Sequence, residues 1–180
     1  MFQNILDEEL LDFNNRLDSD ISRLLRSDRI KIAVAESVTG GAIASRLVSR
    51  PGSSQYFLGG VVAYDTGTKV KLTGVQPKTI RDHGVVSEEV AKEMVVGVQR
   101  LLGSEVALST TGIAGPPTDE FGVKDVGKVF IGLAIKEKVR VKLFQFKGTR
   151  DVIIQDIVQT ALTLVRDQLK QKERSLTNGI

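Results

Sequence analysis

The chain has 180 residues, 41% hydrophobic and 26% charged, and its 25 basic and 22 acidic side chains give a net charge of +3. This composition is typical of a globular domain, and with no run of 18 apolar residues it excludes a disordered chain and a membrane-spanning helix. With no cysteine and one histidine, disulfides, thiolate metal sites, cysteine nucleophiles and two-histidine mechanisms are excluded too.

The small surplus of positive charge is interspersed along the chain. A solvated surface explains it, an anionic small molecule would suit it equally, and only 5% of the residues are aromatic and able to stack on bases. We therefore expect a small-molecule partner, with no nucleic acid and no membrane. The acidic start LDEELLD is the opposite of a signal peptide, so the cytoplasm is the expected compartment.

Residues 1–27 are predicted to form an amphipathic helix. Apolar side chains recur there at spacings of three and four, the period of one helical face, at Leu10, Phe13, Leu17, Ile21 and Leu24. Such a stripe needs a partner surface. The simpler interpretation is that the stripe packs on the rest of the domain. The alternative is that it packs against a second copy of the chain, and on that basis we expect a homo-oligomer, most simply a dimer.

Strands and helices alternate along the rest of the chain. Apolar runs predict three buried strands, at 29–37, 58–64 and 105–110. Helical spacing predicts helices at 39–49, 88–102 and 150–169, and two further apolar runs around KEK predict a hairpin over 127–146. The pattern favours an α/β fold: one three-layer α/β/α sandwich over residues 1–180, with a mostly parallel sheet, an antiparallel hairpin and a frayed tail at 171–180.

Small and hydroxyl-bearing residues gather where the three buried strands end. These segments are AESVTGG, the Tyr64 end of VVAYDTGTK, and LSTTGIAGP. In an open α/β sheet, ligands bind beyond the carboxyl ends of the strands. The three segments are therefore expected to line one crevice.

The first segment, AESVTGG, has the form of an anion-binding turn between a strand and a helix. Gly40 and Gly41 leave N–H groups uncovered at the start of the helix. Ser37 and Thr39 add hydroxyl donors, and Arg150 in the turn before the last helix is the candidate cation. The alternative is a helix capped by a hydroxyl, with glycines for close packing and an exposed arginine.

The choice of nucleophile is narrow. The single histidine, His83, lies in a turn and is more typical of a turn residue than of a general base. A hydroxyl activated by a lysine remains, and the lysine acts as a base only if burial or nearby positive charge lowers its pKa. Lys69 and Tyr64 follow the second strand, whereas Ser54 precedes it in PGSS. The alternative is that these are solvated surface residues.

Five separated blocks carry a family resemblance. AESVTGG, PGSSQYFLGGVVAY, LTGV, HGVVSEEVA and TGIAGP, in this order and spacing, resemble the CinA C-terminal domain family over about residues 28–168. Members include stand-alone nicotinamide mononucleotide amidohydrolases of the PncC type. The resemblance implies a three-layer α/β/α fold and hydrolysis of the carboxamide of nicotinamide mononucleotide to nicotinic acid mononucleotide and ammonia, in pyridine nucleotide salvage. It implies no metal and no organic cofactor.

The resemblance also implies roles for residues at matching positions. Ser54 matches the proposed nucleophile and Lys69 its base. The remaining matches are hydroxyls around the substrate, at Ser37, Tyr64 and Thr111, and a phosphate-binding group, at Gly40, Gly41 and Arg150. We therefore predict a catalytic set of Ser54, Lys69 and Tyr64.

Four segments depart from the family's usual pattern, one of them the loop after TGIAGP, which reads PPTDEFGVKDVG in place of a Gly-rich stretch with a proline before the next Val-Gly. Val38 stands where AESCTGG has cysteine, YDTGTK with Asp65 and Thr66 replaces YSNEAK, and Thr149 replaces the aspartate of GDR. Ser54, Tyr64 and Lys69 are retained. The sequence therefore predicts a nicotinamide-nucleotide amidase; the alternative is a non-catalytic or altered-specificity nucleotide-binding member of the same family.

Overall fold

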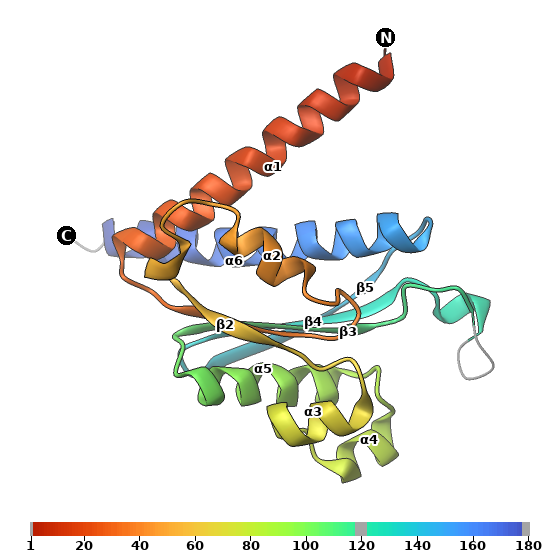
Figure 1. Ribbon diagram of the computed structural model, residues 1–180. Coiled ribbons are helices and arrows are strands. Elements are labelled where there is room, and N and C mark those ends of the chain that lie inside the picture. The colour runs from red at the N-terminus through yellow and green to blue at the C-terminus, as the bar shows by residue number, and fades with distance from the viewer. Residues whose placement is uncertain (1, 118–121, 178–180) are drawn as a thin grey trace.

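The structure is a computed structural model that describes residues 2–117 and 122–177. Side chains are described from residue 12 onward within these ranges, apart from residues 13, 123, 172 and 174–177. Five strands of the described chain form one sheet in the order β2-β1-β3-β4-β5 (Figure 1). They are β1 (Ile32–Glu36), β2 (Phe57–Val62), β3 (Val106–Gly112), β4 (Lys128–Ile135) and β5 (Lys138–Gln145).

The sheet is mixed, and strand β1 lies between β2 and β3 and pairs in parallel with both. β4 runs antiparallel to β3 and to β5. Only β4 therefore opposes the direction of the other four strands, although two of the four pairings are antiparallel. The predicted hairpin is confirmed as β4 and β5, joined by a turn in which Lys136 has a positive φ of 53°.

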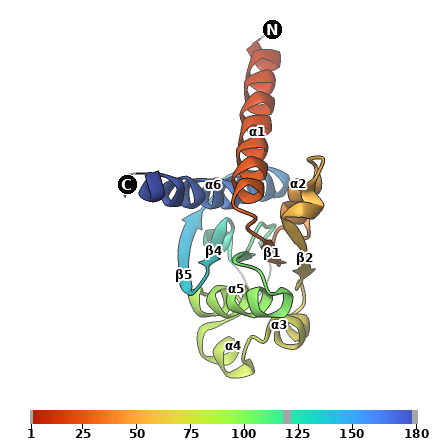
Figure 2. The ribbon, with the colours of Figure 1, turned by 90° about the vertical axis from the view of Figure 1, so that its left-hand side faces the viewer.

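Helices cover both faces of the sheet, so the predicted three-layer α/β/α fold is confirmed (Figure 2). One face carries α1 (Phe2–Ser27), α2 (Ala42–Val48) and α6 (Arg150–Thr177). The other carries α3 (Thr66–Thr73), α4 (Pro77–His83) and α5 (Glu88–Leu102). Two short 3₁₀ turns, η1 (Ser53–Gln55) and η2 (Val123–Asp125), lie in the connections.

The core has two halves because successive side chains of a strand point to opposite faces of the sheet. In β1, Ile32 and Val34 pack towards α1, α2 and α6, and Ala33 packs towards α5. On the α5 side the helices approach closely: a Cβ on Gly97 would lie 1.7 Å from the carbonyl oxygen of Thr73 in α3. This contact sets where α3, and hence Lys69, lies against the domain.

The C-terminal half of α1 packs on the domain, as the simpler interpretation of its stripe predicted. Leu17, Ile21 and Leu24 are buried against the half of the core that includes α6. The side chains of Leu10 and Phe13, which complete the predicted stripe, lie outside the described residues. Figure 1 shows the N-terminal half of α1 extending away from the sheet and the other helices. A homodimer stays a prediction.

The last helix is longer than the sequence predicts. We predict its end at residue 169 and a frayed tail at 171–180, but α6 continues to Thr177. Residues 178–180 lie outside the described residues. None of the described helices is long and apolar enough to cross a bilayer.

Candidate active site

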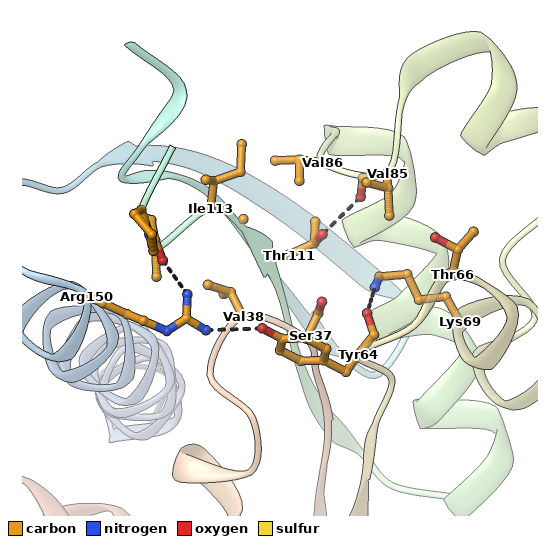
Figure 3. Close-up of a pocket in the computed structure, with 14 residues that line it drawn as sticks. Ser37, Val38, Tyr64, Thr66, Lys69, Val85, Val86, Thr111, Ile113 and Arg150 are labelled. Carbon is orange, nitrogen blue, oxygen red and sulfur yellow. Dashed lines mark hydrogen bonds between the residues drawn. The ribbon is translucent and has the colours of Figure 1, made fainter. Parts of the chain in front are cut away.

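A cavity of about 450 Å³ lies at the carboxyl ends of β1, β2 and β3 (Figure 3). The residues that follow these three strands line it, together with the turn before α5 and the first residue of α6. Five predicted site residues meet there: Ser37, Tyr64, Lys69, Thr111 and Arg150. The expectation of one crevice lined by three strand ends is therefore confirmed.

Ser37 enters the cavity directly from the end of β1. Its backbone N–H donates to the carbonyl oxygen of Thr110 on β3 at 3.0 Å, which extends the sheet ladder by one residue. The residue is 8% exposed. Figure 3 draws Ser37 between the Tyr64 ring and the Lys69 amine, and all three line the same cavity.

Lys69 is the most unusual charged residue of the cavity, since it is only 2% exposed. Its Nζ donates to the carbonyl oxygens of Ala63 at 2.8 Å and Tyr64 at 3.0 Å. Burial lowers the pKa of the Lys69 amine, and the nearby Asp65 carboxylate opposes that shift by raising it. The group therefore loses its proton more readily than an exposed lysine does.

Asp65 accounts for the position of Lys69 near the end of β2. Its Oδ1 accepts hydrogen bonds from the N–H groups of Gly67 at 2.7 Å and Thr68 at 3.3 Å. This is an N-cap, so α3 begins directly after β2. Lys69 then lies in the first turn, where its side chain reaches the last carbonyls before the helix.

The predicted anion site at the start of α2 is already filled by the chain itself. The Glu36 carboxylate, 1% exposed, accepts hydrogen bonds from the N–H groups of Gly41 at 3.1 Å, Ile43 at 3.0 Å and Ala44 at 2.8 Å. The N–H of Gly40 donates to the Ser37 carbonyl oxygen. The prediction that the Gly40 and Gly41 amides hold a substrate phosphate is therefore wrong.

Thr39 also points away from the cavity. Its Oγ1 lies 2.9 Å from Oγ1 of Thr110 in the interior, so the predicted role of its hydroxyl at the substrate is wrong as well. Glu36 is the residue that the sequence interpretation missed, although it stands inside the quoted motif. The sequence did contain an indication of this role: a glutamate four residues before Gly40, close to the predicted start of a helix, where negative charge is favourable.

The structure does not bring Ser54 to Lys69. Ser54 lies in η1, which precedes β2, whereas Lys69 follows that strand. The six residues of β2 rise about 3.3 Å each, so the two ends of the strand are separated by about 20 Å. Ser54 is exposed and is not part of the cavity lining. The predicted pair is therefore wrong, and Ser37 is the serine that shares a cavity with Lys69.

Arg150 is held at the cavity wall by two hydrogen bonds. Its Nη1 donates to the carbonyl oxygen of Gly115 at 2.5 Å, and its Nη2 donates to the Tyr64 hydroxyl oxygen at 3.1 Å (Figure 3). Thr111 Oγ1 donates to the carbonyl oxygen of Val85 at 2.9 Å. Arg150 is thus a fixed cation in the cavity.

His83 matches its sequence interpretation. It is the last residue of α4, and its Nδ1 lies 3.4 Å from the Glu89 carboxylate, outside the cavity. Val38 and Thr66, two of the departures from the family pattern, do line the cavity. These two side chains are therefore placed where they can alter substrate recognition.

The fold and the cavity define a class: an α/β/α domain with a cavity at the carboxyl ends of its strands, lined by a buried lysine and a serine. Ligands of open α/β sheets bind at this position. The family model of the CinA C-terminal domain matches residues 14–169. The chain belongs to this family.

Relatives and solved structures agree with that assignment. A CinA-like protein of Endomicrobium trichonymphae is 44% identical over 172 residues, which cover 95% of this chain and 40% of the relative. A putative competence-damage inducible protein of Clostridium kluyveri is 40% identical over 156 residues, covering 86% of this chain and 37% of the relative. The chain thus spans about two fifths of the length of the curated relatives it matches.

Two crystal structures have the same fold. A CinA superfamily protein of Escherichia coli superimposes with a TM-score of 0.78 at 29% identity, covering 83% of this chain and 87% of that one. A CinA superfamily protein of Klebsiella pneumoniae superimposes with a TM-score of 0.83 at 24% identity, covering 88% and 98%. The second likeness concerns the fold alone.

Proposed function

We propose that this protein is an amidohydrolase that converts nicotinamide mononucleotide to nicotinic acid mononucleotide and ammonia in pyridine nucleotide salvage. One observation carries the proposal: the buried Lys69 amine, with its lowered pKa, lines the same cavity as Ser37. A carboxamide carbon is a poor electrophile, so its hydrolysis needs an activated nucleophile. Membership of the CinA C-terminal domain family supports this reaction class.

The hydrogen bonds of Lys69 suit a neutral base. A neutral amine has two N–H donors and one lone pair, and Lys69 has two carbonyl acceptors, those of Ala63 and Tyr64. With both N–H groups used in this way, the lone pair is left for a third direction. The Ser37 hydroxyl, in the same cavity, would donate its proton to this lone pair.

The chemistry then runs in two halves. Ser37 Oγ attacks the carboxamide carbon while Lys69 takes its proton, and the resulting tetrahedral intermediate expels ammonia, which receives that proton from Lys69. This leaves an ester between Ser37 and the nicotinoyl group. Water, deprotonated by Lys69, cleaves the ester, and the proton returns to Ser37 Oγ as the nicotinic acid product forms.

Groups around this pair have supporting roles. The backbone N–H of Val38 follows the nucleophile, lines the cavity region and has no hydrogen bond to another described residue, so it is the candidate donor to the oxyanion. The Arg150 guanidinium suits the substrate phosphate, and Tyr64 holds that guanidinium in place. The Thr111 hydroxyl lies on the wall beside the substrate.

The test is ammonia release from nicotinamide mononucleotide by the purified protein without added metal. Ser37→Ala is expected to lower kcat by about a thousandfold or more, as loss of a nucleophile does. Ser54→Ala is the matched control, because it removes a serine from the other end of β2. Full activity in Ser37→Ala, or a loss of activity in Ser54→Ala alone, would reject this mechanism.

A second candidate function is a nucleotide-binding member of the family without turnover. Its supporting observation is Asp65, whose charge raises the pKa of Lys69 against the effect of burial. Nicotinamide mononucleotide would then raise the melting temperature without releasing ammonia. Asp65→Asn removes this charge and keeps a residue that caps a helix. If the charge suppresses turnover, this variant should release ammonia where the parent does not.

A further inference from the structure

A second basic cavity lies at the opposite end of the sheet from the candidate active site. It has a volume of about 570 Å³ and lies between the C-terminal half of α1 and the loop that precedes β2. Three arginines, Arg23, Arg26 and Arg50, line it. Among the side chains that the structure describes, no carboxylate is part of this lining.

The arginines come from two segments that the core holds together. Arg23 and Arg26 are three residues apart on α1, so they share a helical face, and the neighbouring Leu24 and Leu25 are buried. Arg50 follows α2 and begins the PGSS loop. A Cβ on Gly52 of that loop would lie 3.5 Å from Nη1 of Arg26, so the guanidinium rests against the loop backbone.

Two of these guanidinium groups donate hydrogen bonds to amide and carbonyl oxygens. Arg26 Nε donates to Gln55 Oε1 at 3.1 Å, and Arg50 Nη2 donates to the backbone oxygen and Oδ1 of Asn15 at 2.8 and 2.9 Å. These acceptors are neutral. Arg50 Nε is buried and, among the described atoms, has no hydrogen-bond partner. A buried donor of this kind favours an added acceptor.

The third guanidinium and the serines complete the wall. Arg23 Nη1 contacts Glu173 Oε1 at 3.2 Å, and both side chains are about half exposed, so a stronger anion can compete for it. Ser19, Ser22 and Ser27 add hydroxyl groups. A hydroxyl can rotate from its present acceptor to a ligand oxygen.

We infer that this cavity binds the phosphate groups of a small phosphorylated ligand. Guanidinium groups bind phosphate through paired N–H donors, and three of them match the charge of a diphosphate more closely than that of a monophosphate. The cavity volume is within the range of small-molecule sites, which leaves room for more than the phosphates. A concave site on a chain of net charge +3 favours a small molecule over nucleic acid.

This site is independent of the proposed reaction. The active-site cavity contains Arg150 and the residues that follow β2, whereas this one contains the loop that precedes β2. A ligand here would not contact Ser37 or Lys69. The two sites can therefore be tested separately in the same protein.

The test is calorimetric titration of the full chain with pyrophosphate and with inorganic phosphate. We expect saturable binding of pyrophosphate that weakens by about tenfold or more in Arg26→Gln, since one charge-assisted pair is lost. Arg81→Gln, which removes an equal charge from α4, is the matched control and should bind as the parent does. Arg150→Gln should also retain this binding.

Three results would overturn the inference: no saturable binding at millimolar pyrophosphate, equal weakening in Arg26→Gln and Arg81→Gln, or loss of binding in Arg150→Gln alone. If Arg26→Gln fails to fold by circular dichroism, Arg23→Gln provides the same test from a half-exposed position. Displacement of pyrophosphate by oligonucleotides with a potency that rises with strand length would also overturn it, because it would indicate a nucleic-acid surface.

Discussion

The two ends of the sheet carry cationic cavities built from different residues. At the carboxyl ends of the strands the central basic side chain is Lys69, which is buried and has its pKa lowered by that burial. At the other end the cations are the three arginines Arg23, Arg26 and Arg50. Burial can bring a lysine close to deprotonation, but an arginine keeps its proton. The difference indicates that the first cavity is suited to proton transfer and the second to holding an anion.

Replacing the lysine gives the largest expected effect. Lys69→Met keeps a side chain of similar length without a base, so kcat for ammonia release should fall by about a thousandfold or more while the protein stays folded. Arg26→Met, the matched change at the other end, should leave kcat unchanged. Equal effects of the two substitutions would break the comparison. The Ser37→Ala, Lys69→Met double variant should be little worse than either single variant, because the two residues act as one unit.

Arg150 extends the comparison of the two cavities, because it is an arginine that lines the active-site cavity. Arg150→Ala should raise KM for the mononucleotide by about tenfold or more through loss of a charged phosphate contact. The corresponding riboside, which lacks the phosphate, should change much less. Steady-state kinetics on both substrates measure this ratio. Equal losses on the two would show that Arg150 does not bind the phosphate.

Glu36 tests whether the start of α2 is closed to ligands. Glu36→Gln keeps the size of the side chain but removes the charge that accepts three backbone N–H groups, so the free energy of unfolding should fall by about 1–3 kcal/mol. Urea denaturation measures it. A second variant, Glu36→Ala, leaves the backbone N–H groups at the start of α2 without their acceptor. Inorganic phosphate should therefore stabilise Glu36→Ala more than the parent protein. Equal stabilisation of the two would contradict the role of the Glu36 carboxylate as an internal cap.

The pH dependence of stability gives the smallest effect. The pKa of Lys69 is lowered in the folded state from its ordinary value of 10.5, so between these two pKa values the unfolded chain binds more protons. Stability from this group therefore rises with pH across that window, by at most about 1.4 kcal/mol per pH unit. Lys69→Met should remove this rise in urea denaturation measured from neutral pH to pH 10. An unchanged slope would show that Lys69 is not desolvated.

Several features follow from local sequence patterns. The predicted helix over 88–102 is confirmed as α5, because its N-cap Ser87 and its C-cap Gly103 act within one helical turn of its ends. The strand ends at Ser37 and Tyr64 were placed on one edge of the sheet, because parallel strands share direction. The same reasoning separates Ser54 from Lys69, since one precedes β2 and the other follows it. The family resemblance, not the strand pattern, led to pairing them.

The sequence by itself determined the layers, the antiparallel hairpin and five of the residues that line the cavity at one edge of the sheet, namely Ser37, Tyr64, Lys69, Thr111 and Arg150. The tertiary structure decided which serine shares a cavity with the lysine, and which carboxylate occupies the start of α2. It also brought Arg23 and Arg26 to Arg50, across more than twenty residues of chain. Helical period, strand alternation and caps act between neighbours, whereas burial of Lys69 and closure of each cavity depend on packing between distant segments.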